Sequence, residues 1–169
     1  HNSKNDTRIG YFKTELIKPI TPNYFNDKKR TSALISLCAL MNILLPESQP
    51  YKVIYKKYEQ LINSLNLENW IILYILYEIS LIKELGYDTN LTVFQKLKNN
   101  LQSLEKVDID GYKYEVPSFL ITQEIPTELD KLIIKKSLAF TRNIFLNKFF
   151  IPNNLIFPKS RIILENYFN

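Results

Sequence analysis

The sequence predicts a mainly α-helical protein, a helical bundle with a small β-hairpin insert and a remnant strand near its N-terminus. Residues 67–87 are apolar nearly all round a helix, which is typical of a helix at the centre of a bundle. Segments on both sides repeat apolar side chains every three or four residues, as amphipathic helices do. An Asp110-Gly111 pair between alternating side chains indicates a tight two-residue hairpin turn within about 107–116.

The central helix has recognisable ends. Asn66 is expected to cap its N-terminus, and Glu68 suits the positive end of the helix dipole. Gly86 follows Leu85 and tolerates the left-handed conformation in which many helices end. The sequence therefore predicts a helix from about residue 67 to residue 85.

Charged residues in and after this stretch decide against a membrane span and predict one buried contact. A spanning helix needs about 20 apolar residues, but Glu78 interrupts the run, and Lys83 and Glu84 end it. An ionised carboxylate among apolar residues is costly without a partner. We therefore predict that Glu78 forms a structural ion pair with Arg142 or Arg161, in preference to acting as a general base.

Four more helices are expected from apolar periodicity and from signals at their ends. Asp27 or Thr31 would cap the first, and short connections between the first three helices imply antiparallel neighbours. In the second, the three lysines, among them Lys57, are expected mostly on the solvated side. The approximate ranges are 27–45 or 31–45, 49–65, 127–147 or 127–150, and 159–167, with a further short helix within 92–104.

The first 27 residues are expected to form a separate N-terminal region. Residues 8–17 mix apolar and polar side chains in a way that suits a strand. Pro19 and Pro22 then interrupt the chain, because each proline fixes its own backbone angle and biases the residue before it to an extended conformation. We expect residues 28–169 to form the helical domain, with the insert at about 91–117.

Composition argues against several kinds of functional site. Cys38 is the single cysteine and lies in an apolar run, so an internal disulfide is impossible and a reduced intracellular setting is expected. His1 is the single histidine, which argues against a structural zinc site or a histidine-based catalytic dyad. We therefore expect no metal, no cofactor and no enzymatic activity. The net charge of +5 permits attraction to a polyanion.

Basic residues form three groups, and each alone suits a solvated face. Together, beside Tyr24, Phe25, Phe149 and Phe157, they would form a surface that follows phosphates and stacks bases. Such a surface would equally receive an acidic peptide with an apolar tip. The candidate binding residues are Lys28, Lys29 and Arg30, then Lys135, Lys136 and Arg142, and finally Lys148, Lys159 and Arg161.

Three segments together resemble one known family. Tyr77-Glu78-Ile79-x-Leu81-Ile82-x-x-Leu85-Gly86-Tyr87 resembles the aromatic-Glu-Leu-x-Leu-Leu-x-x-Leu-Gly-Tyr segment of the RecO family of recombination mediators. Ala139-Phe140-Thr141-Arg142 and Pro158-Lys159-Ser160-Arg161 follow in the order that this family shows. The resemblance spans about residues 33–168.

The chain departs from the family pattern in two places. Members place an OB-fold domain before the helices, but the residues before Ala33 are too few for a five-stranded barrel. We therefore expect a fragment, in which residues 8–17 are the last strand of a largely missing barrel. Phe94 stands where many members have the first cysteine of a zinc-binding insert, so zinc should be missing here.

The resemblance implies a non-enzymatic mediator of homologous recombination, cytoplasmic and associated with the bacterial nucleoid. It would contact the acidic C-terminal tail of the single-stranded DNA-binding protein, RecR and DNA, and would promote RecA loading and strand annealing. One alternative is a helical protein–protein scaffold unrelated to repair, in which the basic groups scatter over the surface. Another is a stand-alone nucleic-acid-binding domain, whose binding would depend steeply on salt. A hydrolase would need Glu78 in a cleft beside a second titratable group.

Overall fold

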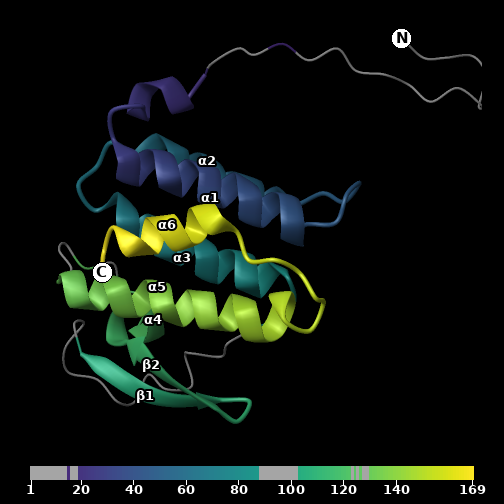
Figure 1. Ribbon diagram of the computed structural model, residues 1–169, viewed down its shortest axis with the longest axis vertical. Coiled ribbons are helices and arrows are strands. Elements are labelled where there is room, and N and C mark those ends of the chain that lie inside the picture. Colours follow the sequence, from purple (N-terminus) through teal and green to yellow (C-terminus); the bar gives the residue numbers. More distant parts are fainter. Residues whose placement is uncertain (1–14, 16–18, 88–102, 123, 125, 127–129) are drawn as a thin grey trace, which may run out of the picture.

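Figure 1 shows the fold as a computed structural model, which describes residues 15, 19–87, 103–122, 124, 126 and 130–169. The described residues form six α-helices and one two-stranded antiparallel sheet, which confirms the mainly α fold class. A 3-10 helical turn (Thr21–Tyr24) precedes the first helix, and a π-helical segment (Leu146–Phe150) continues the fifth. The elements are α1 (Lys28–Leu44), α2 (Lys52–Ser64), α3 (Trp70–Glu84), β1 (Leu104–Ile109), β2 (Tyr112–Pro117), α4 (Ser118–Thr122), α5 (Lys131–Phe145) and α6 (Lys159–Asn166).

Helix α3 lies at the centre of the bundle. In Figure 1, α1 and α2 lie on one side of it and α5 on the other, and the hairpin lies beyond α5. Helix α2 packs on α3, α3 packs on α5, and α6 packs mainly on α1. Nine residues of α3 are buried, and Tyr74, Ile75, Leu81 and Ile82 have no exposed surface. The prediction of a central, buried helix is confirmed.

The start of α3 differs from the prediction. After α2 the chain turns tightly, and the Leu67 N–H donates to the Ser64 carbonyl at 3.0 Å. Helix α3 begins at Trp70, with Asn69 in the N-cap position and without a capping hydrogen bond from its side chain. The predicted Asn66 cap is wrong, because Asn66 lies inside this turn and precedes the first helical residue by four positions.

The end of α3 confirms the role of Gly86. This glycine has a φ of +86°, the left-handed region that side chains with a Cβ rarely adopt. The Tyr87 N–H donates to the Ile82 carbonyl at 3.2 Å, and the Gly86 N–H donates to the Lys83 carbonyl at 3.0 Å. These two bonds form a Schellman motif, which satisfies carbonyl groups that the helix end leaves free.

The remaining helices agree with the prediction to within a few residues. Helix α1 follows Asp27, whose carboxylate accepts the Arg30 N–H at 3.0 Å, so the Asp27 cap is confirmed. Helix α2 starts after residue 49, because the residue before Pro50 is disfavoured in a helical conformation. Helix α5 follows Asp130, which is extended and therefore not part of a first helical turn. Its continuation ends at Phe150, one of the two predicted ends.

The predicted hairpin is confirmed and slightly longer than expected. Strands β1 and β2 pair antiparallel, with Ile109 opposite Tyr112 across the turn. Asp110 and Gly111 both have positive φ angles, +52° and +80°, as a type I′ turn requires. Two expectations lie largely outside the described residues: the strand at 8–17 and the short helix within 92–104, where Leu104 instead begins β1. The boundary after residue 27 stays a prediction.

Candidate functional site

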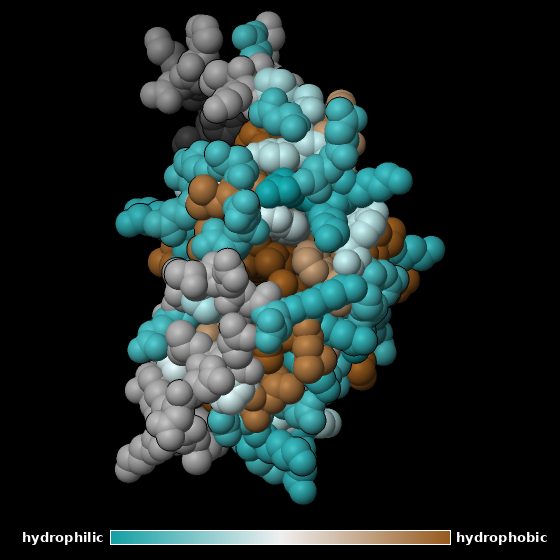
Figure 2. Space-filling view, turned by 90° about the vertical axis from the view of Figure 1, so that its left-hand side faces the viewer, coloured by the Kyte–Doolittle hydropathy of each residue, from teal (hydrophilic) through white to brown (hydrophobic). Residues whose placement is uncertain are grey.

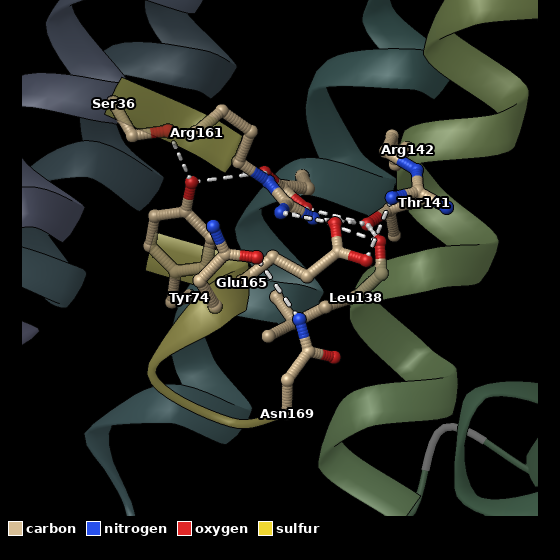
Figure 3. A network of polar contacts seen from close by, with 10 residues as sticks. Ser36, Tyr74, Leu138, Thr141, Arg142, Arg161, Glu165 and Asn169 are labelled. Atoms are coloured by element: carbon tan, nitrogen blue, oxygen red, sulfur yellow. Dashed lines mark hydrogen bonds and ion pairs between the residues drawn. The ribbon is translucent and has the colours of Figure 1, made fainter. Parts of the chain in front are cut away.

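A buried network of charges joins α3, α5 and α6 (Figure 3). Arg161 of α6 donates from Nε to Glu78 Oε1 at 2.5 Å and from Nη2 to Glu78 Oε2 at 3.0 Å. Both side chains are 0% exposed. The geometry is bidentate, which is the strongest arrangement of a guanidinium and a carboxylate. The predicted structural ion pair of Glu78 is confirmed, with Arg161 as its partner.

Hydroxyl and carbonyl groups complete the surroundings of this pair. Glu78 also accepts hydrogen bonds from the hydroxyls of Tyr74 (2.9 Å) and Thr141 (2.6 Å), and Arg161 Nη2 donates to the Leu138 carbonyl (2.8 Å). Burial raises the pKa of Tyr74, and the charge of Glu78 raises it further. Burial alone would lower the pKa of Arg161, but Glu78, Tyr74 and Glu165 together outweigh burial and raise that pKa. Arg161 is therefore held in its charged form.

A second carboxylate balances the charges. Glu165 accepts from Arg161 Nη1 at 3.3 Å and from Arg142 Nη1 at 3.0 Å. Two guanidinium groups thus face two carboxylates, and Figure 3 shows Arg142 and Glu165 beside the buried pair. Glu78 has no contact with solvent, so it is not placed in a cleft as a general base would be.

The surface prediction is wrong for Arg161. Its helix turns Arg161, Leu164 and Glu165 inward, while Ile162 and Ile163 are 42% and 49% exposed. An arginine with no exposed surface cannot meet DNA or a peptide at the surface of the folded domain. Its role is to hold α6 on α3 and α5.

Arg30 is also occupied inside the bundle. Its Nε donates to the Leu65 carbonyl and its Nη2 to the Leu67 carbonyl, the latter at 3.0 Å. Its other guanidinium nitrogen pairs with Asp27, and the group lies 5.5 Å from the centre of the Trp70 ring. Arg30 therefore fixes the turn between α2 and α3 and is only partly available to a ligand.

Two further predicted residues hold the hairpin on the bundle. Lys148 donates to Asp110 Oδ2 at 2.7 Å and lies 4.8 Å from the centre of the Tyr87 ring. The Tyr87 hydroxyl donates to the same carboxylate oxygen at 2.8 Å. Lys136 pairs with Glu115 of β2. These contacts join the hairpin to α5 and to the end of α3.

Four predicted residues are exposed and form no ion pair with a described carboxylate: Lys28, Lys29, Lys135 and Lys159. Lys29 lies 5.1 Å from the centre of the Phe168 ring, so the start of α1 meets the end of α6. Figure 1 shows α1 and α5 starting on one side of the molecule, whereas α6 runs toward that side, so that its first residue, Lys159, lies at the end of α6 away from the start of α1. Figure 2 views the side on which α1 and α5 start, where hydrophilic residues surround hydrophobic ones. The predicted residues therefore do not form one continuous basic surface.

The aromatic residues of the predicted surface are also divided. Phe149 packs on Phe145 and on Tyr87, and Phe157 packs on Phe150 with ring centres 5.0 Å apart. Phe25, in contrast, is 66% exposed beside the start of α1. Of the four aromatic residues of the predicted surface, Phe25 is therefore the exposed one, and it precedes Lys28 and Lys29 closely in the sequence.

A groove between α2 and α3 was not predicted. Its volume is about 420 Å³, within the range of about 300–1,000 Å³ that is usual for ligand sites. Three leucines and a tyrosine form half of its lining, and the polar groups come from both helices. The lining residues are Lys57, Gln60, Leu61, Ser64, Leu73, Leu76, Tyr77 and Ser80.

Lys57 is the charged residue of this groove. Its Nζ donates to Ser80 Oγ at 2.7 Å, which joins α2 to α3 across the groove. No ion pair joins Lys57 to a carboxylate among the described residues. The lysine was expected on a solvated face, and its exposure agrees with that, but its contact across α3 depends on how the two helices pack. An exposed ammonium above an apolar floor is suited to a carboxylate beside an apolar group.

Two other features lie near this groove. The Tyr77 hydroxyl is buried and has no hydrogen-bond partner among the described residues, and burial raises its pKa. A second groove of about 470 Å³ lies between α1 and α2, and Met41, Leu45, Tyr55 and Tyr58 are among its lining residues. Its lining is apolar apart from Lys52 and the tyrosine hydroxyls, and no hydrogen bond to another described residue joins Lys52 across it as Lys57 is joined to Ser80.

Neither a group of metal ligands nor a membrane-spanning helix is found among the described residues. No three His, Cys, Asp or Glu side chains gather among them as metal ligands would. None of the helices in the described ranges combines the length and apolar character needed to cross a bilayer. The predicted absence of zinc stays a prediction, since Phe94 lies outside the described residues.

The sequence of the chain is similar to those of known proteins. The family described as recombination protein O C terminal matches residues 26–106. The DNA repair protein RecO of Wolbachia sp. subsp. Drosophila simulans is 24% identical over 181 residues, which cover 96% of this chain and 75% of that protein. RecO of Ehrlichia chaffeensis is 31% identical over 93 residues, 54% of this chain and 38% of that protein.

Further relatives agree with these. RecO of Rhodospirillum centenum is 31% identical over 80 residues, 47% of this chain and 32% of that protein. The shorter alignments thus cover less than two fifths of the relatives' own length. No solved structure matches the chain at a significant level. The family match includes residues 77–87, which carried the resemblance in the sequence, and the chain is similar to the RecO family of DNA repair and recombination proteins.

Proposed function

We propose that this chain is a non-enzymatic mediator of homologous recombination and that its α2–α3 groove binds the acidic C-terminal tail of the single-stranded DNA-binding protein. One observation carries this proposal. Lys57 stands exposed over an apolar floor without a carboxylate partner among the described residues. An acidic peptide with an apolar tip needs this combination of a cation and an apolar pocket.

The charges around the groove fit such a ligand. Helix α2 carries three lysines and one glutamate, and no carboxylate is among the described residues that line the groove. A terminal aromatic ring would lie on Leu61, Leu73 and Leu76, while a neighbouring carboxylate would meet Lys57. The groove therefore offers what the predicted basic surface was expected to offer, at a different place.

The buried network supports a non-enzymatic role. Glu78 is a carboxylate in an apolar setting, where an acid with an altered proton affinity would be sought. Its oxygens accept four hydrogen bonds, two from Arg161 and two from hydroxyls, and its side chain has no exposed surface. This carboxylate serves the fold and has no access to a substrate.

Similarity to the RecO family extends the proposal to further partners. We propose contacts with RecR and with DNA, promotion of RecA loading and strand annealing, and a place in the bacterial cytoplasm at the nucleoid. For DNA, Lys28 and Lys29 are the best placed of the predicted residues, since both are exposed and lie near the exposed Phe25. The separation of the other lysines favours DNA contact shared with another domain over independent binding, and it favours protein docking as the role of this domain.

The proposal is tested by titrating a fluorescently labelled peptide of acidic residues ending in phenylalanine. We expect saturable binding, and Lys57→Met should raise the Kd about five- to tenfold, because a charge-assisted hydrogen bond is lost. Leu76→Asp should weaken binding at least as much, since it places a carboxylate on the apolar floor.

A matched control comes from another exposed lysine. Lys159→Met removes the same charge at the start of α6 and should change the Kd less than twofold. If the wild-type chain does not bind the peptide, or if Lys57→Met binds it as tightly as the wild type does, the groove is not the site.

A further inference from the structure

The contact between Lys57 and Ser80 has a fixed direction. The Ser80 hydroxyl donates its proton to the Leu76 carbonyl one turn earlier, at 2.9 Å. Its oxygen can therefore act only as an acceptor for Lys57, whose ammonium donates at 2.7 Å. The contact joins α2 to α3, and both side chains line the groove.

Lys57 would gain from exchanging this partner. A carboxylate binds an ammonium more strongly than a neutral hydroxyl does, because both groups are charged. Ser80 would lose little, since its hydrogen bond to Leu76 does not depend on Lys57. The contact between them is exposed, and exposed contacts contribute only weakly. It can therefore open and close without disturbing either helix.

We propose that Lys57 and Ser80 form a latch across the α2–α3 groove that competes with the ligand and selects for a carboxylate. In the empty groove Ser80 holds the ammonium, and on docking the ammonium transfers to a carboxylate of the peptide. This inference rests on the proposed function. An uncharged ligand would have to displace Lys57 from Ser80 without giving it a comparable partner, so the latch discriminates against it.

The latch is tested by a double-mutant cycle on peptide binding with Ser80→Ala, Lys57→Met and the combination. Ser80→Ala should bind the acidic peptide about two- to fivefold more tightly than the wild type, because the competing hydrogen bond is gone. In the Lys57→Met background the same Ser80→Ala change should have no effect. Ser160→Ala is the matched control, since Ser160 lies on α6 and is not among the residues that line the groove, and it should stay within twofold of the wild type.

The outcomes separate the latch from the groove. If the wild type binds and Lys57→Met weakens binding, but Ser80→Ala is unchanged or weaker, the groove is correct and the latch is not. A gain from Ser80→Ala that persists without Lys57 also overturns the latch, because the gain then has another origin. Absence of wild-type binding overturns both. Thermal unfolding of each variant shows whether it is folded.

Discussion

Helix α3 contacts α5 and α6 on one side and α2 on the other. A charged side chain from a neighbouring helix is buried on the first side and exposed on the second. Toward α5 and α6, Glu78 is sealed from water and holds Arg161 by two hydrogen bonds. Toward α2, Ser80 holds the ammonium of Lys57 by one exposed hydrogen bond. Arg161 therefore has a carboxylate partner within the protein, whereas Lys57 has only a hydroxyl partner among the described residues.

The difference lies in what each charge would lose on leaving its partner. A guanidinium removed from Glu78 would abandon a buried carboxylate, which is strongly unfavourable. An ammonium removed from Ser80 leaves a hydroxyl that keeps its bond to Leu76, and it enters water or meets a ligand. Burial thus makes one contact structural, and exposure leaves the other free to exchange.

The largest expected effect is the decrease in stability when Arg161 is replaced. Arg161→Met should lower the free energy of unfolding by about 3–5 kcal/mol, because Glu78 is left buried without its charge partner. Urea denaturation followed by circular dichroism measures the change. Combining it with Glu78→Leu should recover part of the loss, since both charges are then absent.

A neighbour on the same helix provides the control for this effect. Lys159→Met removes an exposed charge from α6 and should change the free energy of unfolding by less than about 0.5 kcal/mol. Similar losses in Lys159→Met and Arg161→Met would contradict the assignment of Arg161 as the residue that holds α6.

Two tyrosines on α3 give a smaller effect of opposite sign. The Tyr74 hydroxyl donates to Glu78 and lies 2.7 Å from the Ser36 hydroxyl, whereas the Tyr77 hydroxyl has no partner among the described residues. Tyr74→Phe should therefore destabilise the protein by about 1–3 kcal/mol, since it leaves buried groups unpaired. Tyr77→Phe removes an unpaired buried group and should stabilise it by up to about 1 kcal/mol.

The same urea denaturation measures both variants. Each substitution removes one oxygen from a buried ring on one helix, so differences in size and helix propensity cancel. Equal changes in the two variants would show that the hydroxyl partners do not decide the stability.

The sequence predicted the buried pair because Glu78 is the one carboxylate inside an apolar run. It left Arg142 and Arg161 as alternatives, since which arginine reaches Glu78 depends on how α5 and α6 pack. Arg161 was also counted among the surface residues, because a group of basic side chains is typical of a solvated face. In the structure Ile162 and Ile163 are exposed, and the polar Arg161 and Glu165 are buried with Leu164.

The groove was beyond what the sequence could predict. Hydrophobic periodicity assigns Lys57 to the outer side of α2, and Lys57 is exposed in the structure. The partner Ser80 lies 23 residues away on another helix, and nothing local marks the two as neighbours. The hairpin turn was predictable for the opposite reason, because Asp110 and Gly111 carry the required conformational preference themselves.

The smallest expected effect concerns the exposed contacts of Asp110 with Lys148 and Tyr87 at the hairpin turn. The hydrogen bonds from Lys148 and Tyr87 hold the pKa of Asp110 below its usual value of 3.8. The folded protein therefore binds fewer protons than the unfolded chain near pH 4, so this contribution is present above about pH 4 and is lost as the pH falls through the lowered pKa. Asp110→Asn keeps a residue that tolerates a φ of +52° and removes the charge.

We expect the wild type to be slightly more stable than Asp110→Asn at pH 6, and the difference to shrink toward pH 3. Urea denaturation midpoints at pH 6, 4 and 3 measure this difference in stability. When the same measurements are made in a Lys148→Met background, Asp and Asn at position 110 should give nearly the same midpoints. Salt should reduce the difference at pH 6, because the pair is exposed and a high ionic strength screens it. A difference that is constant across this range would mean that Asp110 acts through the turn geometry alone.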